Sequence, residues 1–226
     1  MRFGYAATRA TAQFLFHFGY GLEIHGIESI PRAGAVIIAS NHRSTLDPPL
    51  LGSIIRREVH FFAKEELFSN PFTGAYLRYL NAFPVRRGRF DRTSLKYCLD
   101  LLAKDQALVF FPEGTRAPKS GFLRAKIGLG WVVGLSHAPV LPAYIHGSAE
   151  AKPRLRNRPN LSIVFGKPIP ASELIPPDLR GHELYQTISD AVLERIRDLS
   201  LTTPNRRVKS RGILYDRDII EEERLR

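Results

Sequence analysis

The sequence has a single cysteine, Cys98, among its 226 residues. One cysteine excludes a disulfide within the chain and any structural metal site that needs several thiolates. The absence of disulfides is typical of a reducing compartment. We interpret Cys98 as a core residue, because free cysteines are among the most buried residue types.

Long apolar runs are also missing from the amino terminus. Arg9, Gln13, His17 and Glu23 interrupt the apolar residues there, whereas a membrane-spanning helix needs about 20 consecutive, mainly apolar residues. No spanning helix is therefore expected. The segment also lacks the charged start, unbroken apolar middle and small-residue cleavage site of a secretory signal. We expect it to remain in the mature protein, and the protein to be cytoplasmic.

Acidic residues are outnumbered, since 22 Asp and Glu face 33 Lys and Arg and give a formal net charge of +11. This excess favours an anionic partner: nucleic acid, an anionic membrane surface or a phosphorylated substrate. No zinc-finger, helix-turn-helix or RNA-recognition signature is present, so a nucleic-acid partner is not expected. A metal-dependent hydrolase with His42 and Asp47 as ligands is a weaker alternative, because no further cluster has metal-ligand spacing. No metal is expected.

Short apolar runs alternate with helical patterns along the chain. Runs of apolar residues predict strands at 35–40, 82–85, 107–111, 140–145 and 161–165. Helical periodicity predicts helices at 73–80, 95–102, 127–136 and 183–199. Thr93 and Ser94 are the capping candidates of the second helix. We therefore expect an α/β fold, a single domain with a mostly parallel central sheet flanked by helices.

The two ends of the chain differ from this pattern. Residues 3–20 predict an aromatic-rich, amphipathic N-terminal helix. Such a helix either docks on the body of the protein or lies in the membrane interface with Phe and Leu side chains submerged. We favour the membrane, because other parts of the sequence suggest a lipid substrate. Residues 202–226 are polar and charged, and predict a solvated helix or a disordered tail.

Polar residues follow several predicted strands at their carboxyl ends. His42 follows the strand at 35–40, Arg87 follows the strand at 82–85, and Glu113 and Arg116 follow the strand at 107–111. Ligands of open α/β sheets bind outside these strand ends. We expect the four side chains to converge on one site.

His42 and Asp47 lie five positions apart, and on a continuous helix their side chains would point about 140° apart. The predicted loop before Pro48 supplies a turn that can bring them together. An imidazole accepts a proton from an alcohol, while a carboxylate fixes its tautomer and stabilises the imidazolium. This is the chemistry of a catalytic triad without a protein nucleophile. The spacing alone also fits a surface histidine beside an unrelated helix-capping aspartate.

Two sequence blocks, taken together, favour the catalytic pair over the unrelated surface histidine and capping aspartate. Asn41-His42-Arg43-Ser44-Thr45-Leu46-Asp47 follows one buried strand, and Phe111-Pro112-Glu113-Gly114-Thr115-Arg116 follows another. Together they resemble the glycerolipid acyltransferase family typified by 1-acylglycerol-3-phosphate acyltransferase. The resemblance extends over roughly residues 25–170, and it implies that His42 is the catalytic base and Asp47 its orienting partner.

The same resemblance implies a set of substrate-binding residues. The second block is taken to bind the glycerophosphate, which implies that role for Glu113, Gly114, Thr115 and Arg116. A further block is similar to residues 81–87, with Asn81 in place of the usual glycine, and adds Arg87 as a second phosphate contact. Lys126 and Pro142 match blocks that the resemblance assigns to the acyl donor or the oxyanion. Arginine suits this role, because its guanidinium is permanently charged and binds phosphate in a bidentate manner.

The expected function is transfer of a fatty acyl group from acyl-CoA or acyl carrier protein to the free hydroxyl of 1-acylglycerol-3-phosphate, giving phosphatidate. Another lyso-lipid acceptor is the alternative. The acyl thioester is a co-substrate, and no cofactor is expected. The expected partners are the two substrates, an anionic membrane surface and, for one donor, acyl carrier protein.

The expected organisation has three parts. Residues 1–24 are a membrane-associating amphipathic helix, residues 25–200 are the acyltransferase domain, and residues 201–226 are a charged tail. Such a protein is expected at the cytoplasmic face of the cell membrane, as a peripheral or monotopic protein.

Overall fold

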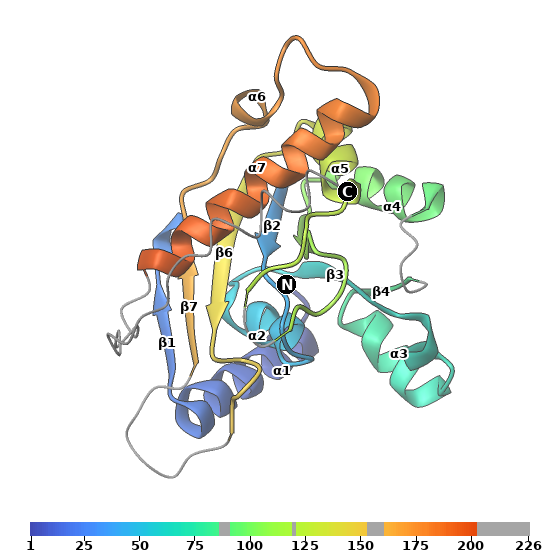
Figure 1. Ribbon diagram of the computed structural model, residues 1–226. Coiled ribbons are helices and arrows are strands. Elements are labelled where there is room, and N and C mark those ends of the chain that lie inside the picture. Colours follow the sequence, from blue (N-terminus) through green and yellow to red (C-terminus); the bar gives the residue numbers. More distant parts are fainter. Residues whose placement is uncertain (86–90, 119–120, 153–160, 203–226) are drawn as a thin grey trace.

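The computed structural model describes residues 1–85, 91–118, 121–152 and 161–202 (Figure 1). In these residues seven strands form one sheet, in the order β1-β7-β6-β2-β5-β3-β4. The strands are β1 (Leu22–His25), β2 (Val36–Ser40), β3 (Val59–Lys64), β4 (Ala82–Val85), β5 (Ala107–Phe110), β6 (Val140–His146) and β7 (Leu161–Phe165). Strands β6 and β7 pair antiparallel, and all the other neighbouring pairs are parallel. The prediction of an α/β domain with a mostly parallel sheet is confirmed.

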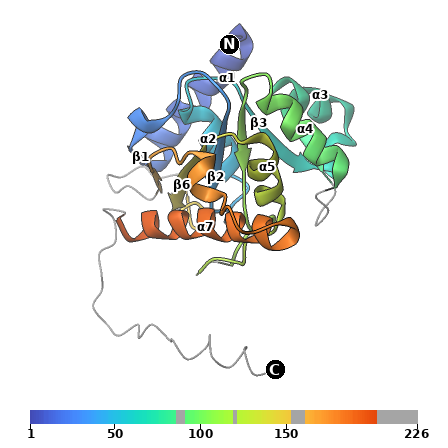
Figure 2. The same ribbon diagram turned by 90° about the horizontal axis from the view of Figure 1, so that it is seen from above.

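Helices cover both faces of this sheet (Figure 2). The helices are α1 (Phe3–Phe14), α2 (Asp47–Ile54), α3 (Pro71–Tyr79), α4 (Arg92–Leu102), α5 (Gly128–Ser136), α6 (Ala171–Leu174) and α7 (Gly181–Thr202). A π-helical turn, η1 (Leu15–Gly19), continues α1, and two 3-10 turns are η2 (Ile27–Ser29) and η3 (Glu65–Phe68). Helices α4, α5 and α7 pack on one face, while α2 and η1 pack on the other.

Strand β2 lies at the centre of the sheet and is buried on both faces. Val36 and Ile38 face the layer of α2, Ile37 and Ala39 face the layer of α4, α5 and α7, and all four are fully buried. Each large apolar side chain buried in this way contributes roughly 1.5–3 kcal/mol. Cys98 on α4 is also fully buried, and burial raises the pKa of its thiol to about 12.

The sheet topology determines where the site lies. Strands β5 and β6 flank β2 and both run parallel to it. Their carboxyl ends therefore meet at one edge of the sheet, and the loops that follow them lie together. Strand β4 is farther away, because β5 and β3 separate it from β2.

Some local details differ from the sequence-based expectations, and strand β3 is among the elements that the apolar runs did not predict. The N-cap of α4 is Asp91, whose side chain accepts a hydrogen bond from the Ser94 amide, so the expectation of Thr93 or Ser94 as the cap was wrong. Aspartate is as good a cap as serine, and Asp91, two or three residues earlier, satisfies the Ser94 amide in the first turn of the helix. Strand β1 was not predicted, because four residues next to an amphipathic helix carry little periodicity of their own.

Helix α1 is docked on the body of the protein. Arg2 forms an ion pair of 2.8 Å with Glu58, the Tyr5 hydroxyl accepts a hydrogen bond from the Val59 amide, and Arg9 donates to the Ser53 carbonyl. Burial alone would raise the pKa of Glu58, but hydrogen bonds, chiefly from Arg2, outweigh burial and lower it to about 2. These contacts hold the N-terminal helix on the body of the protein, and its association with a membrane stays a prediction.

Candidate active site

The site begins where β2 ends, at the buried residue Asn41. The Asn41 side chain donates from Nδ2 to the Ile145 carbonyl (2.9 Å) and accepts at Oδ1 from the Ile145 amide (2.7 Å). This pair of bonds ties the end of β2 to the end of β6. The next residue, His42, therefore starts from a fixed backbone position.

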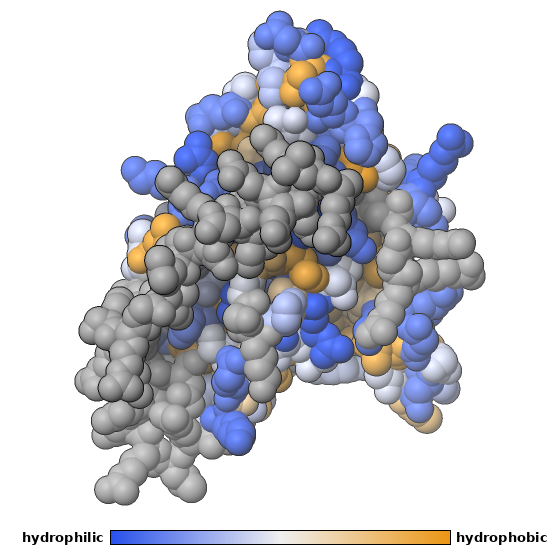
Figure 3. All heavy atoms as spheres, in the orientation of Figure 1, coloured by the Kyte–Doolittle hydropathy of each residue, from blue (hydrophilic) through white to orange (hydrophobic). Residues whose placement is uncertain are grey.

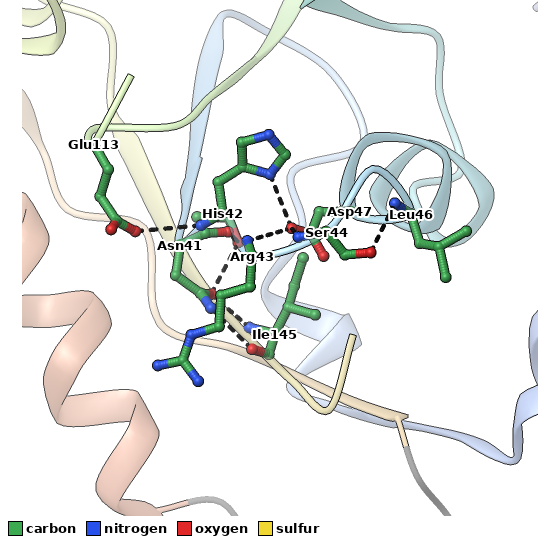
Figure 4. Close-up of polar contacts among 9 residues, drawn as sticks. Asn41, His42, Arg43, Ser44, Leu46, Asp47, Glu113 and Ile145 are labelled. Carbon is green, nitrogen blue, oxygen red and sulfur yellow. Dashed lines mark hydrogen bonds and ion pairs between the residues drawn. The ribbon is translucent and has the colours of Figure 1, made fainter. Parts of the chain in front are cut away.

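His42 and Asp47 form a hydrogen-bonded pair, with 2.9 Å between His42 Nδ1 and Asp47 Oδ2 (Figure 4). Asp47 is fully buried, and the His42 side chain is 18% exposed. The same Oδ2 accepts hydrogen bonds from the Arg43 and Ser44 amides, both at 2.7 Å. These bonds fold the loop back on itself, which is the turn that the five-residue spacing required.

This geometry sets the tautomer of His42. An ionised carboxylate only accepts hydrogen bonds, so the Nδ1 of a neutral His42 beside it carries the hydrogen. The other ring nitrogen, Nε2, then has a free lone pair, and it points away from Asp47 (Figure 4). An imidazole held in this way can accept a proton from a bound alcohol.

The second sequence block folds over the first. The Phe111 ring stacks on the His42 ring, with 4.2 Å between centroids and an interplanar angle of 22°. The His42 amide donates to Glu113 Oε1 (3.3 Å), and the His42 carbonyl accepts from the Ala117 amide (2.7 Å). Glu113 Oε2 accepts from the Leu123 amide (2.7 Å). Burial raises the pKa of the Glu113 carboxyl, and the two amide hydrogen bonds partly oppose that shift.

The exposed part of this block carries positive charge. Gly114, Thr115 and Arg116 are exposed, and so is Lys126, whose amide donates to the Pro112 carbonyl (2.8 Å). Gly114 has a φ of +62°, and a Cβ there would lie 2.8 Å from the Lys126 Cδ. Glycine therefore allows both the left-handed backbone and the close approach of the lysine chain.

The structure brings together some of the expected site residues and not others. His42 is in direct contact with both Asp47 and Glu113, and Arg116 lies on the same loop as Glu113. Arg87 lies outside the described residues, so its role as a phosphate contact stays a prediction. Pro142 is buried within β6, where it is paired with Ala39 of β2 and its carbonyl accepts from the Gly166 amide. In the described part of the chain, no group of three or more His, Cys, Asp or Glu side chains could hold a metal ion.

Several contacts of the site were not predicted. The Asn41–Ile145 pair joins residues that are 104 positions apart, and no local pattern indicates such a partner. The stacking of Phe111 on His42 joins the two blocks across neighbouring strands. Phe111 belongs to the second block, but the sequence indicates only that this residue ends an apolar run.

The structure is an α/β domain with a hydrogen-bonded His–Asp pair beyond the end of its central strand. The sequence pattern of the family described as Acyltransferase matches residues 21–146, which is more than half of the chain. The chain belongs to the acyltransferase family.

Two similar proteins have more specific names than the family. The chain is 28% identical over 180 residues to the 1-acyl-sn-glycerol-3-phosphate acyltransferase of Bacillus subtilis, covering 79% of this chain and 88% of that protein. It is 29% identical over 161 residues to the chloroplastic 1-acyl-sn-glycerol-3-phosphate acyltransferase LPAT1 of Arabidopsis thaliana, covering 68% of this chain and 45% of that protein.

A solved structure shares the fold. The crystal structure of the 1-acyl-sn-glycerophosphate (LPA) acyltransferase PlsC from Thermotoga maritima aligns with a TM-score of 0.66 and 24% identity, covering 87% of this chain and 78% of that chain. At this identity the likeness shows the shared fold alone.

Proposed function

We propose that this protein transfers a fatty acyl group from a thioester to the free hydroxyl of 1-acylglycerol-3-phosphate, giving phosphatidate. The observation that carries the proposal is the hydrogen bond between His42 Nδ1 and the fully buried Asp47 carboxylate. The names of the relatives from Bacillus subtilis and Arabidopsis thaliana support the choice of acceptor.

The proposed reaction uses His42 as the general base and then as the general acid. The acceptor hydroxyl gives its proton to His42 Nε2 while its oxygen attacks the thioester carbonyl carbon. Asp47 stabilises the imidazolium that forms. The tetrahedral intermediate then loses its C–S bond, and the departing thiolate takes the proton from Nε2. The products are phosphatidate and a free thiol, without an acyl-enzyme, a metal ion or a cofactor.

The acceptor phosphate is proposed to bind at the exposed cations next to this pair. Arg116 is exposed on the loop that carries Glu113, and the Lys126 chain lies against Gly114 of the same loop. The exposed Gly114–Thr115 segment has backbone amides that can add donors to a phosphate oxygen. Positive charge at this point also suits the overall net charge of +11.

We expect Arg116→Ala to raise KM for lysophosphatidate by about 10- to 100-fold, because one charge-assisted hydrogen bond is worth roughly 1.5–3 kcal/mol. Monoacylglycerol, which has no phosphate, should show almost no change. Initial rates with both acceptors check this. The matched control is Arg195→Ala, an exposed arginine on α7. Equal losses on both acceptors would assign Arg116 to some other role.

The donor and the acceptor headgroup are tested in the same assay. Labelled acyl-CoA and acyl carrier protein thioesters are each supplied with lysophosphatidate in anionic vesicles. Histidine-dependent formation of phosphatidate supports the proposal and identifies the donor. Product from another lyso-lipid, with none from lysophosphatidate, supports the alternative acceptor.

Peripheral membrane association is the second part of the proposal. Six large hydrophobic side chains are exposed on α1, η1 and α3: Phe3, Phe14, Leu15, Phe18, Phe72 and Tyr76. Helices α1 and α3 adjoin, since the Arg2 guanidinium lies 4.9 Å from the Tyr79 ring centroid. Hydrophobic surface over α3 is visible at the lower right of Figure 3. No helix among the described residues is long and apolar enough to span a membrane.

The double substitution Phe3→Ser and Phe72→Ser should lower binding to anionic vesicles at least about tenfold. Burying each phenylalanine side chain contributes roughly 1.5–3 kcal/mol to that binding. The two side chains are 91% and 85% exposed, so folding should be unaffected. Vesicle flotation measures the effect. Leu135→Ser on α5, which is 50% exposed in the opposite helical layer, is the control. Unchanged flotation of the double variant would argue against this surface.

A further inference from the structure

Glu113 is a charged residue without an exposed functional atom, since it is 1% exposed. Its Oε1 accepts from the His42 amide, and its Oε2 accepts from the Leu123 amide. The carboxylate thus joins three segments: the loop after β2, the loop after β5 and the residues that precede α5. Two hydrogen bonds to a charged acceptor offset part of the cost of burying it.

These contacts do not suit a phosphate ligand. A phosphate monoester and a carboxylate are both anions and only accept hydrogen bonds when ionised, so contact between them is repulsive. The residues that follow Glu113 are different, because Gly114, Thr115 and Arg116 are exposed and offer donors. The loop therefore divides into a buried part that faces His42 and an exposed part that can face an anion.

The backbone of His42 is held from several sides. Its amide donates to Glu113, its carbonyl accepts from the Ala117 amide, and the preceding Asn41 is bonded twice to Ile145. The ring direction depends on this backbone, because Asp47 fixes only Nδ1. General-base catalysis needs Nε2 close to hydrogen-bonding distance from the hydroxyl, and a displacement of about 1 Å can cost roughly 100-fold in rate.

We infer that Glu113 is a positioning residue, which acts through its bonds to the His42 and Leu123 amides and makes no contact with the acceptor phosphate. The inference rests on the proposed function for its kinetic consequences. The protection of the His42 and Leu123 amides from hydrogen exchange does not depend on any enzymatic activity.

The test replaces Glu113 with glutamine, which keeps the size of the side chain but turns one acceptor into a donor. Either orientation of the amide places an NH2 against a backbone N–H. We expect kcat to fall by about 10- to 100-fold with both lysophosphatidate and monoacylglycerol, while KM for each stays within about twofold. Glu113→Asp keeps the charge but is one methylene too short for both amides, so kcat should fall with both acceptors as well. The matched control is Glu173→Gln, an exposed glutamate on α6.

A second readout follows the His42 and Leu123 amides by hydrogen exchange in the wild type and in Glu113→Gln. We expect both amides to exchange faster in the variant, with global stability measured alongside as a reference. The inference is overturned if KM rises with lysophosphatidate alone while kcat is retained, which is the behaviour of a phosphate contact. It is also overturned if both amides keep their wild-type protection. A wild type that makes no phosphatidate would instead refute the proposed function, whatever the exchange result.

Discussion

His42→Ala should lower the rate of acyl transfer by about 10²- to 10⁴-fold, because it removes the group proposed to accept the hydroxyl proton. Substrate binding should change little, since the exposed cations at Arg116 and Lys126 remain. We therefore expect the loss of rate to appear as a lower kcat. Initial rates with labelled donor over a range of lysophosphatidate concentrations separate kcat from KM.

The fold of this variant should survive. Among the described residues the His42 side chain has one hydrogen-bond partner, Asp47, and Asp47 Oδ2 keeps its bonds to the Arg43 and Ser44 amides. Loss of the Phe111 stacking contact costs roughly 0.5–1.5 kcal/mol. Circular dichroism and thermal unfolding check the fold, and His182→Ala, an exposed histidine on α7, is the matched control. A variant that retains the wild-type rate would remove His42 from the mechanism.

The architecture was predictable from the sequence because the central strands are buried on both faces. Fully apolar runs such as the one at 107–110 are typical of strands in a parallel sheet covered by helices. Their alternation with helical periodicity then indicates the α/β class. Strand order was not predictable, since the pairing of β1 with β7 joins segments more than 130 residues apart.

The site was predictable in its chemistry and only partly in its geometry. The spacing of His42 and Asp47 required a turn, and the structure has one. The direction of the Glu113 side chain depends on the amides of His42 and Leu123, which belong to segments that meet only after the sheet has formed. A sequence block identifies Glu113 as part of the site, but a linear pattern does not show whether it faces solvent or the protein.

Asp47→Asn should lower kcat by about 10²- to 10³-fold for a different reason from His42→Ala. Three donors face the same oxygen, Asp47 Oδ2: His42 Nδ1 and the Arg43 and Ser44 amides. The asparagine carbonyl oxygen should therefore occupy this position, which keeps the tautomer of His42. What is lost is the negative charge beside the imidazolium, worth about 4 kcal/mol for charges about 4 Å apart at an effective dielectric constant near 20.

The same substitution should also lower stability. With the carbonyl oxygen at the Oδ2 position, the asparagine NH2 takes the place of Oδ1, which is buried and has no hydrogen-bond partner among the described residues. A buried donor without an acceptor costs about 1–3 kcal/mol. The charge that is removed lies in the first turn of α2, where the helix dipole stabilises an anion by roughly 0.3–1 kcal/mol. The midpoint of thermal unfolding should therefore fall.

Kinetics and unfolding together test this account of Asp47. Asp100→Asn on the exposed face of α4 is the control, because it makes the same chemical change in a side chain that is 54% exposed to solvent. A loss of kcat below about threefold in Asp47→Asn, in a protein that remains folded, would show that the carboxylate charge does not stabilise the imidazolium. Loss of kcat without any change in stability would contradict the predicted position of the amide nitrogen.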